Sequence, residues 1–216
     1  MSFLEKYGIQ VNNKSLYETA LTHSSYTNEH KNLDNYERLE FLGDAVLELV
    51  TSEYFYLHSD FKEGEMTKHR ANYVCEKALA TYAKEMGLDS EIRLGVGQIH
   101  HLNDTIVADV FEAMVGAIYL DQGFLVARKY ILDIMVPYIE KETYFNMDFK
   151  TILQEYVQTD RKSLEYEVIK EYGEAHNKRF EAIVKIDNII YGKGVGKSKK
   201  EAEQMAARDA YNKSAQ

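Results

Sequence analysis

The sequence of 216 residues is long enough for one or two domains, and its 45% of hydrophobic residues can form a packed core. No apolar run approaches the length of about eighteen residues that a membrane span needs, Glu5 interrupts the stretch where a signal peptide would be apolar, and Cys75 is the single cysteine. A soluble, cytoplasmic protein without membrane contact is therefore expected. Taken over the whole chain, the net charge of −9 is the wrong sign for a protein that binds nucleic acid.

The first predicted elements are short helices with loops between them, from Leu4 to Tyr26. His23 in this region is interpreted as a histidine that is hydrogen-bonded inside the core rather than as a catalytic group. A long helix follows from Tyr36 to about Leu57, and we expect the rest of the chain to be organised around it.

The long helix carries an acidic stripe roughly opposite an apolar one. A period of 3.6 residues places Glu37, Glu40 and Asp44 close together on one side. Like charges at these spacings weaken a helix by roughly 0.2–0.5 kcal/mol per pair unless something offsets their repulsion. A divalent cation would offset it, whereas the simpler interpretation of such a stripe in isolation is a solvated face.

Further helices are predicted over residues 67–87, 106–120 and 124–136. Gly123 is expected to stop the second of them in a left-handed conformation, and Pro137 is expected to end the third. Between Leu88 and Asn103 the chain is predicted to be irregular. The adjacent His100 and His101 in this segment do not share a helix face, which argues against a zinc site.

The helix predicted over residues 106–120 contains Asp109 and Glu112 in an otherwise almost wholly apolar segment. Carboxylates buried there without partners would be too costly to be incidental. If this helix meets the acidic stripe of the long helix, Asp109 and Glu112 join Glu40 and Asp44 in an oxygen-rich site. Such a site suits Mg²⁺ or Mn²⁺ and leaves positions for water and a phosphate oxygen.

Residues 141–146 are predicted to form a short polar linker that lets two domains move while keeping them close. The charge also divides here, because residues 147–216 hold 13 Lys and Arg against 12 Asp and Glu, so the acidic excess belongs to the first part. An acidic surface repels a polyphosphate. The first part would therefore need bound cations or a tethered RNA-binding module to engage one.

Residues 147–216 have the pattern of a small α+β domain in the order α-β-β-β-α. A short amphipathic helix at 149–157, antiparallel strands near 164–168, 180–186 and 189–191, and a last helix after residue 197 are predicted in turn. Asp187-Asn188 predicts a tight turn between the second and third strands. Ser198 and Glu201 have the spacing of a capping box at the start of the last helix.

Lysines gather at the start of this last helix. Lys197, Lys199 and Lys200 coincide there with the positive end of the helix dipole and with backbone N–H groups. A single lysine near a turn would be interpreted as merely solvated. Three of them beside Gly194 and Gly196 predict a phosphate-binding site.

The motif ERLEFLGDAVL at Glu37–Leu47 resembles the signature of the ribonuclease III family. Ala20–Ser24 resembles an early Ala-Leu-Thr-His motif of that family, and further matching segments follow in the expected order at 63–64, 70–71, 108–113 and 116–123. The second domain resembles the double-stranded-RNA-binding domain over essentially its whole length, including GKSKKEAEQMAA at residues 196–207.

This resemblance implies an all-α endonuclease domain over residues 1–140, a linker over 141–146 and a small α+β double-stranded-RNA-binding domain over 147–216. The implied activity is metal-dependent hydrolysis of double-stranded RNA to 5′-phosphate and 3′-hydroxyl ends, with Mg²⁺ as cofactor and Mn²⁺ able to substitute. A homodimer in which each subunit cuts one strand is implied as well. So is the processing of ribosomal RNA precursors and other structured transcripts.

The resemblance also implies roles for single residues. Glu40, Asp44, Asp109 and Glu112 are expected to bind the metal, Asp44 and Glu112 to act in catalysis, Glu37 and Glu63 to be supporting acidic groups, and Phe41 to insert into the partner subunit. In the second domain, Thr151, Gln154 and Glu155 are expected to face one RNA minor groove, His176 to reach the next, and Lys197, Ser198, Lys199 and Lys200 to contact the intervening phosphates.

The sequence departs from the family pattern at Gln98 and Asn103-Asp104, where an acidic residue and an Arg-Glu pair are usual, and at Glu174-Ala175, where a proline is frequent. These departures affect local RNA contacts and leave the carboxylate set intact. Two other functions stay open. A non-catalytic RNA-binding scaffold would be favoured by loss of a carboxylate, and the RNA-binding tail argues against a helical metal-dependent enzyme acting on free nucleotides.

Overall fold

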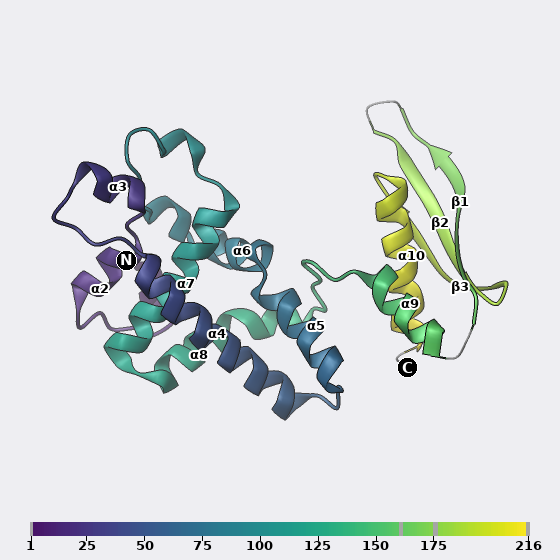
Figure 1. Cartoon of the computed structure of the whole chain (residues 1–216), viewed down its shortest axis with the longest axis horizontal. Coiled ribbons are helices and arrows are strands. Elements are labelled where there is room, and N and C mark those ends of the chain that lie inside the picture. The colour runs from purple at the N-terminus through teal and green to yellow at the C-terminus, as the bar shows by residue number, and fades with distance from the viewer. Residues whose placement is uncertain (1, 160–161, 175–176, 215–216) are drawn as a thin grey trace. The chain divides into compact units, whose positions relative to one another are not determined.

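The computed structural model describes residues 2–159, 162–174 and 177–214. The chain divides into two compact units, Met1–Met147 and Asp148–Gln216 (Figure 1). The first unit is built of helices, and the described residues of the second unit combine helices with a three-stranded antiparallel sheet. This architecture confirms the predicted fold class, a helical domain followed by an α-β-β-β-α domain.

The first unit contains the helices α1 (Ser2–Glu5), α2 (Lys14–Ala20), α3 (Ser24–Glu29), α4 (Glu37–His58), α5 (Glu63–Val74), α6 (Glu76–Met86), α7 (Asp104–Gln122) and α8 (Phe124–Glu140). The short 3₁₀ turns η1 (Leu88–Glu91) and η2 (Ile99–His101) lie in the segment predicted to be irregular. α4 corresponds to the long helix predicted from the sequence. Over the described ranges, no helix is both long enough and apolar enough to cross a membrane.

The prediction of one helix over residues 67–87 is wrong, because the chain forms the separate helices α5 and α6 there. α5 begins at Glu63, and the Glu65 carboxylate accepts a hydrogen bond from the Lys62 backbone N–H at 3.1 Å. Cys75 interrupts the helical path with an extended backbone (φ −71°, ψ 155°), so it ends α5 and begins α6. Its thiol donates to the Asn72 carbonyl oxygen at 3.3 Å.

The end of α8 also differs from the prediction, because the helix continues through Pro137 to Glu140. Proline removes one backbone donor, yet its carbonyl can still accept, and the Lys141 N–H donates to the Pro137 carbonyl at 3.3 Å. At Gly123 the expected positive φ is present (82°). Its ψ of 176° is extended, so the residue is not in the left-handed helical conformation.

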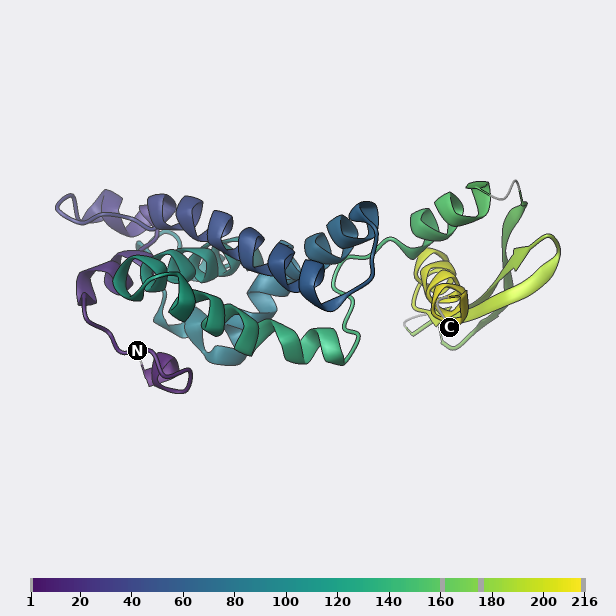
Figure 2. The same ribbon diagram turned by 90° about the horizontal axis from the view of Figure 1, so that it is seen from below.

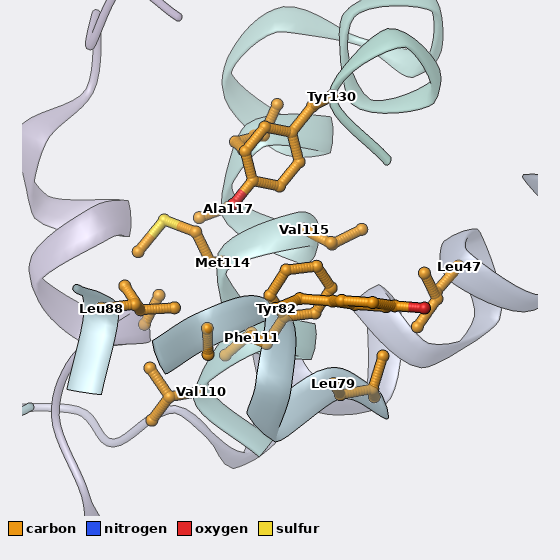
Figure 3. Packing of buried hydrophobic residues seen from close by; sticks show 14 of the residues in the cluster. Leu47, Leu79, Tyr82, Leu88, Val110, Phe111, Met114, Val115, Ala117 and Tyr130 are labelled. Atoms are coloured by element: carbon orange, nitrogen blue, oxygen red, sulfur yellow. The ribbon is translucent and has the colours of Figure 1, made fainter. Parts of the chain in front are cut away.

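The core of the first unit is centred on α7, whose residues from Ile106 to Ile118 are almost all buried. Figure 3 shows Phe111, Met114 and Ala117 of this helix packed among Tyr82 of α6, Leu47 of α4 and Tyr130 of α8. A helix that is apolar on nearly all sides must be surrounded by other elements. Asp109 and Glu112, which lie within this buried stretch of α7, are therefore held close to neighbouring elements.

α4 and α7 cross with their backbones in direct contact, and they lie side by side in Figures 1 and 2. A methyl carbon built on Gly43 would lie 1.8 Å from the Glu112 carbonyl oxygen. One built on Gly116 would lie 2.3 Å from the Leu39 carbonyl oxygen. Both distances are far shorter than any contact that two such atoms can make, so only glycine permits this crossing.

The segment predicted to be a mobile linker is partly held by the first unit. The buried Asn72 side chain donates to the Thr143 carbonyl at 3.1 Å and accepts from the backbone N–H groups of Phe145 and Asn146 at 2.8 and 3.0 Å. The Phe145 ring contacts the ring of Tyr82, with their centroids 5.7 Å apart. The chain from Thr143 to Asn146 is therefore fixed to helices α5 and α6, whereas the movement of the two domains that the linker is expected to allow stays a prediction.

The second unit contains α9 (Phe149–Thr159), β1 (Leu164–Tyr172), β2 (Arg179–Ile186), β3 (Ile189–Gly196) and α10 (Lys199–Ser214). The strands are antiparallel in the order β1-β2-β3, as predicted, and both helices lie on one side of the sheet in Figures 1 and 2. Asp187 and Asn188 both have positive φ (49° and 65°), which is the conformation of the tight hairpin turn that their residue types predict.

α10 packs on β3 through a row of glycines. Methyl carbons built on Gly192 and Gly194 would lie 2.2 Å from the backbone oxygen and nitrogen of Ala206, and one on Gly196 would lie 2.5 Å from the Ala202 nitrogen. The helix presents Ala202, Ala206 and Ala210 at this contact. Small residues on both elements allow the helix and the strand to approach at backbone distance.

We expect Gly43→Ala to lower the free energy of unfolding by about 3 kcal/mol or more, because the added carbon forces α4 and α7 apart. Gly64→Ala is the matched control, since nothing lies within 4 Å of a methyl carbon at that helical position. The control should leave stability unchanged or raise it by up to about 1 kcal/mol. Urea denaturation followed by circular dichroism measures both, and equal effects of the two substitutions would contradict the close crossing.

Candidate metal centre and nucleic-acid interface

The helix crossing positions the acidic residues of the first unit. Asp44 follows Gly43 on α4, and Gly43 touches the backbone of Glu112 on α7. Glu40 lies one turn before Asp44 on α4, and Asp109 lies one turn before Glu112 on α7. The contact between the two helix backbones thus carries both pairs of carboxylates into the same region.

Among the four carboxylic acids, Glu112 has the pKa that this clustering shifts most. Burial, together with the charges of Asp44, Glu40, Asp109 and Glu48, raises the pKa of Glu112 from its usual value of 4.5 to about 8. Burial disfavours the charged form of a carboxyl group, and each nearby negative charge disfavours it further. Without a cation nearby, Glu112 therefore holds a proton at neutral pH. A positive charge bound beside it would be stabilised.

The other three carboxylates shift in the same direction. Burial, followed by repulsion from Asp109, Glu37 and Asp44, raises the pKa of Glu40. Burial and the charge of Glu48 raise the pKa of Asp44. The pKa of Asp109 is also raised, mainly by burial, although a hydrogen bond opposes the shift. The four groups therefore share one electrostatic environment that is unfavourable to their ionised forms.

The side chains do not converge on one point as they stand. In the described parts of the chain, no three His, Cys, Asp or Glu side chains are close enough together to hold a metal ion. The donor chemistry nevertheless fits a hard divalent cation, because Glu40, Asp44, Asp109 and Glu112 offer only carboxylate oxygens. Asp44 is exposed and the other three are partly buried, so none of the four residues is fully removed from solvent.

Two further residues belong to this region and are not in the set predicted from the sequence. Glu48 repels both Asp44 and Glu112, and its spacing of four from Asp44 extends the acidic stripe in a way that the sequence does show. Tyr36 donates a hydrogen bond from its hydroxyl to Oδ2 of Asp109 at 3.1 Å. No spacing rule links Tyr36 to a residue that lies more than seventy positions later.

His23 lies beside Tyr36, with 5.7 Å between ring centroids. Its Nδ1 accepts a hydrogen bond from the Ser25 backbone N–H at 3.1 Å, so the ring caps the start of α3. Burial lowers the pKa of His23, and the charges of Asp109 and Glu37 act in the opposite direction. His23 is thus hydrogen-bonded as expected, but it is half-buried at the edge of the carboxylate cluster rather than inside the core, and its structural role stays a prediction.

The two supporting acids occupy different places. Glu37 lies close enough to repel Glu40 and is part of the cluster. Glu63, in contrast, lines a cavity of about 490 Å³ together with Tyr56 and Arg70, beside the C-terminal half of α4. α4 rises about 18 Å between Asp44 and Tyr56 at 1.5 Å per residue. Within one chain, the structure therefore does not bring Glu63 to the carboxylates, because α5 begins only after α4 has ended.

Phe41 is an apolar side chain in an unusual position. It is 82% exposed on α4, directly after Glu40, although it belongs to a helix whose other face is deeply buried. Leu49 and Tyr56 on the same helix are also exposed, at 57% and 73%. Large apolar groups on one helix are costly to leave in water and mark this surface as a candidate contact.

The residues expected to contact RNA lie on the surface of the second unit. Thr151, Gln154 and Glu155 are exposed on α9. The N-terminal turn of that helix is fixed by Asp148, which accepts hydrogen bonds from the Thr151 N–H at 3.1 Å and from the Thr151 hydroxyl at 2.9 Å. The expected contact of His176 lies outside the described residues.

Lys197, Ser198, Lys199 and Lys200 are all exposed at the N-terminus of α10. Ser198 caps the helix, because its hydroxyl accepts from the Glu201 N–H at 3.1 Å. The Glu201 carboxylate reaches back to the Lys197 N–H at 2.6 Å, one residue earlier than a standard capping box. The backbone is thereby fixed while the three ammonium groups extend into solvent near the positive end of the helix dipole.

Comparison with known families matches both units. A family model described as ribonuclease-III-like matches residues 13–139, and one described as a double-stranded RNA binding motif matches residues 149–214. Ribonuclease 3 of Onion yellows phytoplasma (strain OY-M) is 44% identical over 216 residues, which cover 98% of this chain and 90% of that protein. Ribonuclease 3 of Streptococcus pyogenes serotype M1 is 44% identical over 212 residues, covering 94% and 92%.

Solved structures resemble the first unit. A nuclease domain of ribonuclease III from Campylobacter jejuni, described as structurally flexible in a region involved in dimer formation, has a TM-score of 0.58 and 35% identity over 62% of this chain and 94% of that chain. A second structure of that nuclease domain has a TM-score of 0.55 and 36% identity, over 65% and 93%. Since the matches together span both units, the chain belongs to the ribonuclease III family.

Proposed function

We propose that this chain is an endoribonuclease that hydrolyses double-stranded RNA with the help of Mg²⁺, for which Mn²⁺ can substitute, and leaves 5′-phosphate and 3′-hydroxyl ends. The observation that carries the proposal is the electrostatic cluster of Glu40, Asp44, Asp109 and Glu112. Burial and mutual repulsion there raise the pKa of Glu112 to about 8. The same chain carries a double-stranded RNA binding motif, so the cluster is tethered to a module for the substrate.

Glu40, Asp109, Glu112 and Asp44 are the residues that would hold the cation. When bound, the cation would lower the pKa of an attacking water and neutralise charge that grows on the phosphate and on the leaving oxygen. Asp44 is the exposed member of the set, so its carboxylate can accept a hydrogen bond from that water and orient it. Glu112 is deeper and must lose its proton before it can act as a ligand.

The second unit would bind the duplex by shape. Thr151, Gln154 and Glu155 on α9 would contact a minor groove through 2′-hydroxyl groups, and Lys197, Lys199 and Lys200 would contact phosphates across the adjoining major groove. Ser198 fixes the helix end that presents these lysines. Since the first unit holds the acidic excess of the chain, binding of the polyanion depends on this tethered module and on cations at the carboxylates.

The active form would be a homodimer. Phe41 presents an almost fully exposed aromatic side chain next to Glu40, and its burial against a second copy would remove that surface from water. Each subunit would then cut one strand, and the product would carry a short 3′ overhang. Ribosomal RNA precursors and other structured transcripts in the cytoplasm are the proposed substrates.

Glu112→Gln should abolish cleavage of a duplex RNA while leaving its binding almost intact, because the amide cannot supply an anionic ligand. Chelation of divalent cations should have the same effect on the unaltered protein. Glu140→Gln, at the exposed end of α8, is the control and should cleave normally. A gel-based cleavage assay and a mobility-shift assay measure cleavage and binding, with free nucleotides as a second substrate. Near-normal cleavage by the Glu112 variant would contradict the proposed site.

Stability of the metal-free protein should depend on pH through Glu112. Because its folded pKa of about 8 lies above the usual 4.5, the folded state retains a proton in this interval and loses stability as the pH rises toward 8. Glu112→Gln does not titrate, so it should become increasingly more stable than the unaltered protein from pH 5 to pH 8. Urea denaturation in a chelator measures the difference, and a difference independent of pH would contradict the clustering.

Phe41→Ala should weaken the dimer, since it removes the exposed aromatic side chain from the proposed contact. Val96→Ala is a matched control, because Val96 is also largely exposed (75%) but lies outside α4. Size-exclusion chromatography with light scattering should show a monomer for the Phe41 variant and a dimer for the control. A Phe41 variant that stays fully dimeric at low micromolar concentration would contradict the assignment.

A further inference from the structure

We propose that Tyr36 is a positioning residue for the metal centre: its hydroxyl holds the Asp109 carboxylate in the orientation needed to bind a divalent cation. This inference rests on the proposed function, in which Asp109 is a ligand. It concerns a residue that would not touch the cation or the RNA itself. Its effect would be exerted through one hydrogen bond, between the Tyr36 hydroxyl and Oδ2 of Asp109 at 3.1 Å.

The hydrogen bond engages one oxygen of a carboxylate that has two. Asp109 is half-buried on a helix that is surrounded by other elements, which limits the positions open to its carboxylate. A phenol donor at Oδ2 fixes the rotation of the carboxylate and leaves Oδ1 for a cation. The Tyr36 hydroxyl can donate in this way whether or not a cation is present.

Tyr36 is itself held firmly. It precedes α4, is only 3% exposed, and donates from its backbone N–H to the Thr22 carbonyl at 2.9 Å. Its ring packs against that of His23, which caps α3 through Ser25. The backbone of Thr22 is paired with that of Arg93 in an isolated bridge. Because both its backbone and its ring are held, Tyr36 can keep the Asp109 carboxylate in one orientation.

Asp109 has acidic neighbours that repel it, although the charge of His23 acts on it in the opposite sense. Glu40 lies close enough to be affected by its charge, and Glu76 acts on Asp109 in the same unfavourable sense. Without the tyrosine donor, rotation of the carboxylate away from the other acids would reduce this repulsion. The hydrogen bond thus opposes the movement that would take one ligand out of the set, which is the function of outer-sphere partners in metal sites.

The test is Tyr36→Phe, which keeps the buried ring and removes only the hydroxyl. We expect the affinity for Mn²⁺, measured directly by electron paramagnetic resonance of the free ion, to fall about tenfold or more. The Mg²⁺ concentration for half-maximal cleavage of a duplex RNA should rise by the same factor, and saturating Mg²⁺ should restore most of the rate. Binding of the duplex without metal should be unchanged.

Tyr17→Phe is the matched control, because the buried Tyr17 donates its hydroxyl to Oδ2 of Asp121 at 2.9 Å, near the other end of α7. A purely structural role for Tyr36 predicts the same behaviour in both variants, namely a lower melting temperature with unaltered Mn²⁺ affinity. Unaltered Mn²⁺ affinity in Tyr36→Phe overturns the inference. If the unaltered protein binds Mn²⁺ but does not cleave RNA, the proposed function fails while the role of Tyr36 is still decided by the binding measurement.

Discussion

The contact between the backbones of α4 and α7 at Gly43 and Gly116 is the constraint on which the first unit depends. A methyl carbon at either position would lie within 2.3 Å of a backbone atom of the opposite helix. Since the helices meet this closely, the residues that flank the contact have little freedom in where their side chains begin. Asp44 and Glu112 are such residues, so main-chain packing determines where these side chains begin, while the side-chain hydrogen bond from Tyr36 acts on Asp109.

This arrangement is costly to the folded protein in the absence of a cation. Four carboxylates with raised pKa values, two of them on the helix at the centre of the core, lie among like charges, and Glu40, Asp109 and Glu112 are also partly buried. Such a site is a local loss of stability that the surrounding apolar core must offset. Tyr36 supplies one compensating hydrogen bond, to Asp109, and the remaining repulsion is what makes the region attractive to a divalent ion.

The parts of the fold that could be predicted from the sequence are those determined by local periodicity. The acidic stripe of α4, the alternating strands and the Asp187-Asn188 turn follow from residue spacing and intrinsic conformational preference, and the structure contains all of them. The break at Cys75 and the passage of α8 through Pro137 could not be predicted this way. Both depend on the surrounding structure, because neither residue type alone requires a helix to end or to continue.

In the candidate site, too, some residues could be predicted from local sequence pattern and others could not. Glu40, Asp44, Asp109 and Glu112 could be selected because they are acidic residues at helical spacing, two of them in an apolar segment. Tyr36 and the displaced position of Glu63 depend on which segments meet in three dimensions, for which a single sequence carries no signal. In the second unit, the glycines of β3 bring α10 to backbone distance from the sheet, so the backbone that carries Lys197, Lys199 and Lys200 is held at a fixed distance from the sheet. If these lysines contact phosphates as proposed, a duplex with a different groove width could not be accommodated by moving that helix, and the sheet would then contribute to selectivity for one helical form.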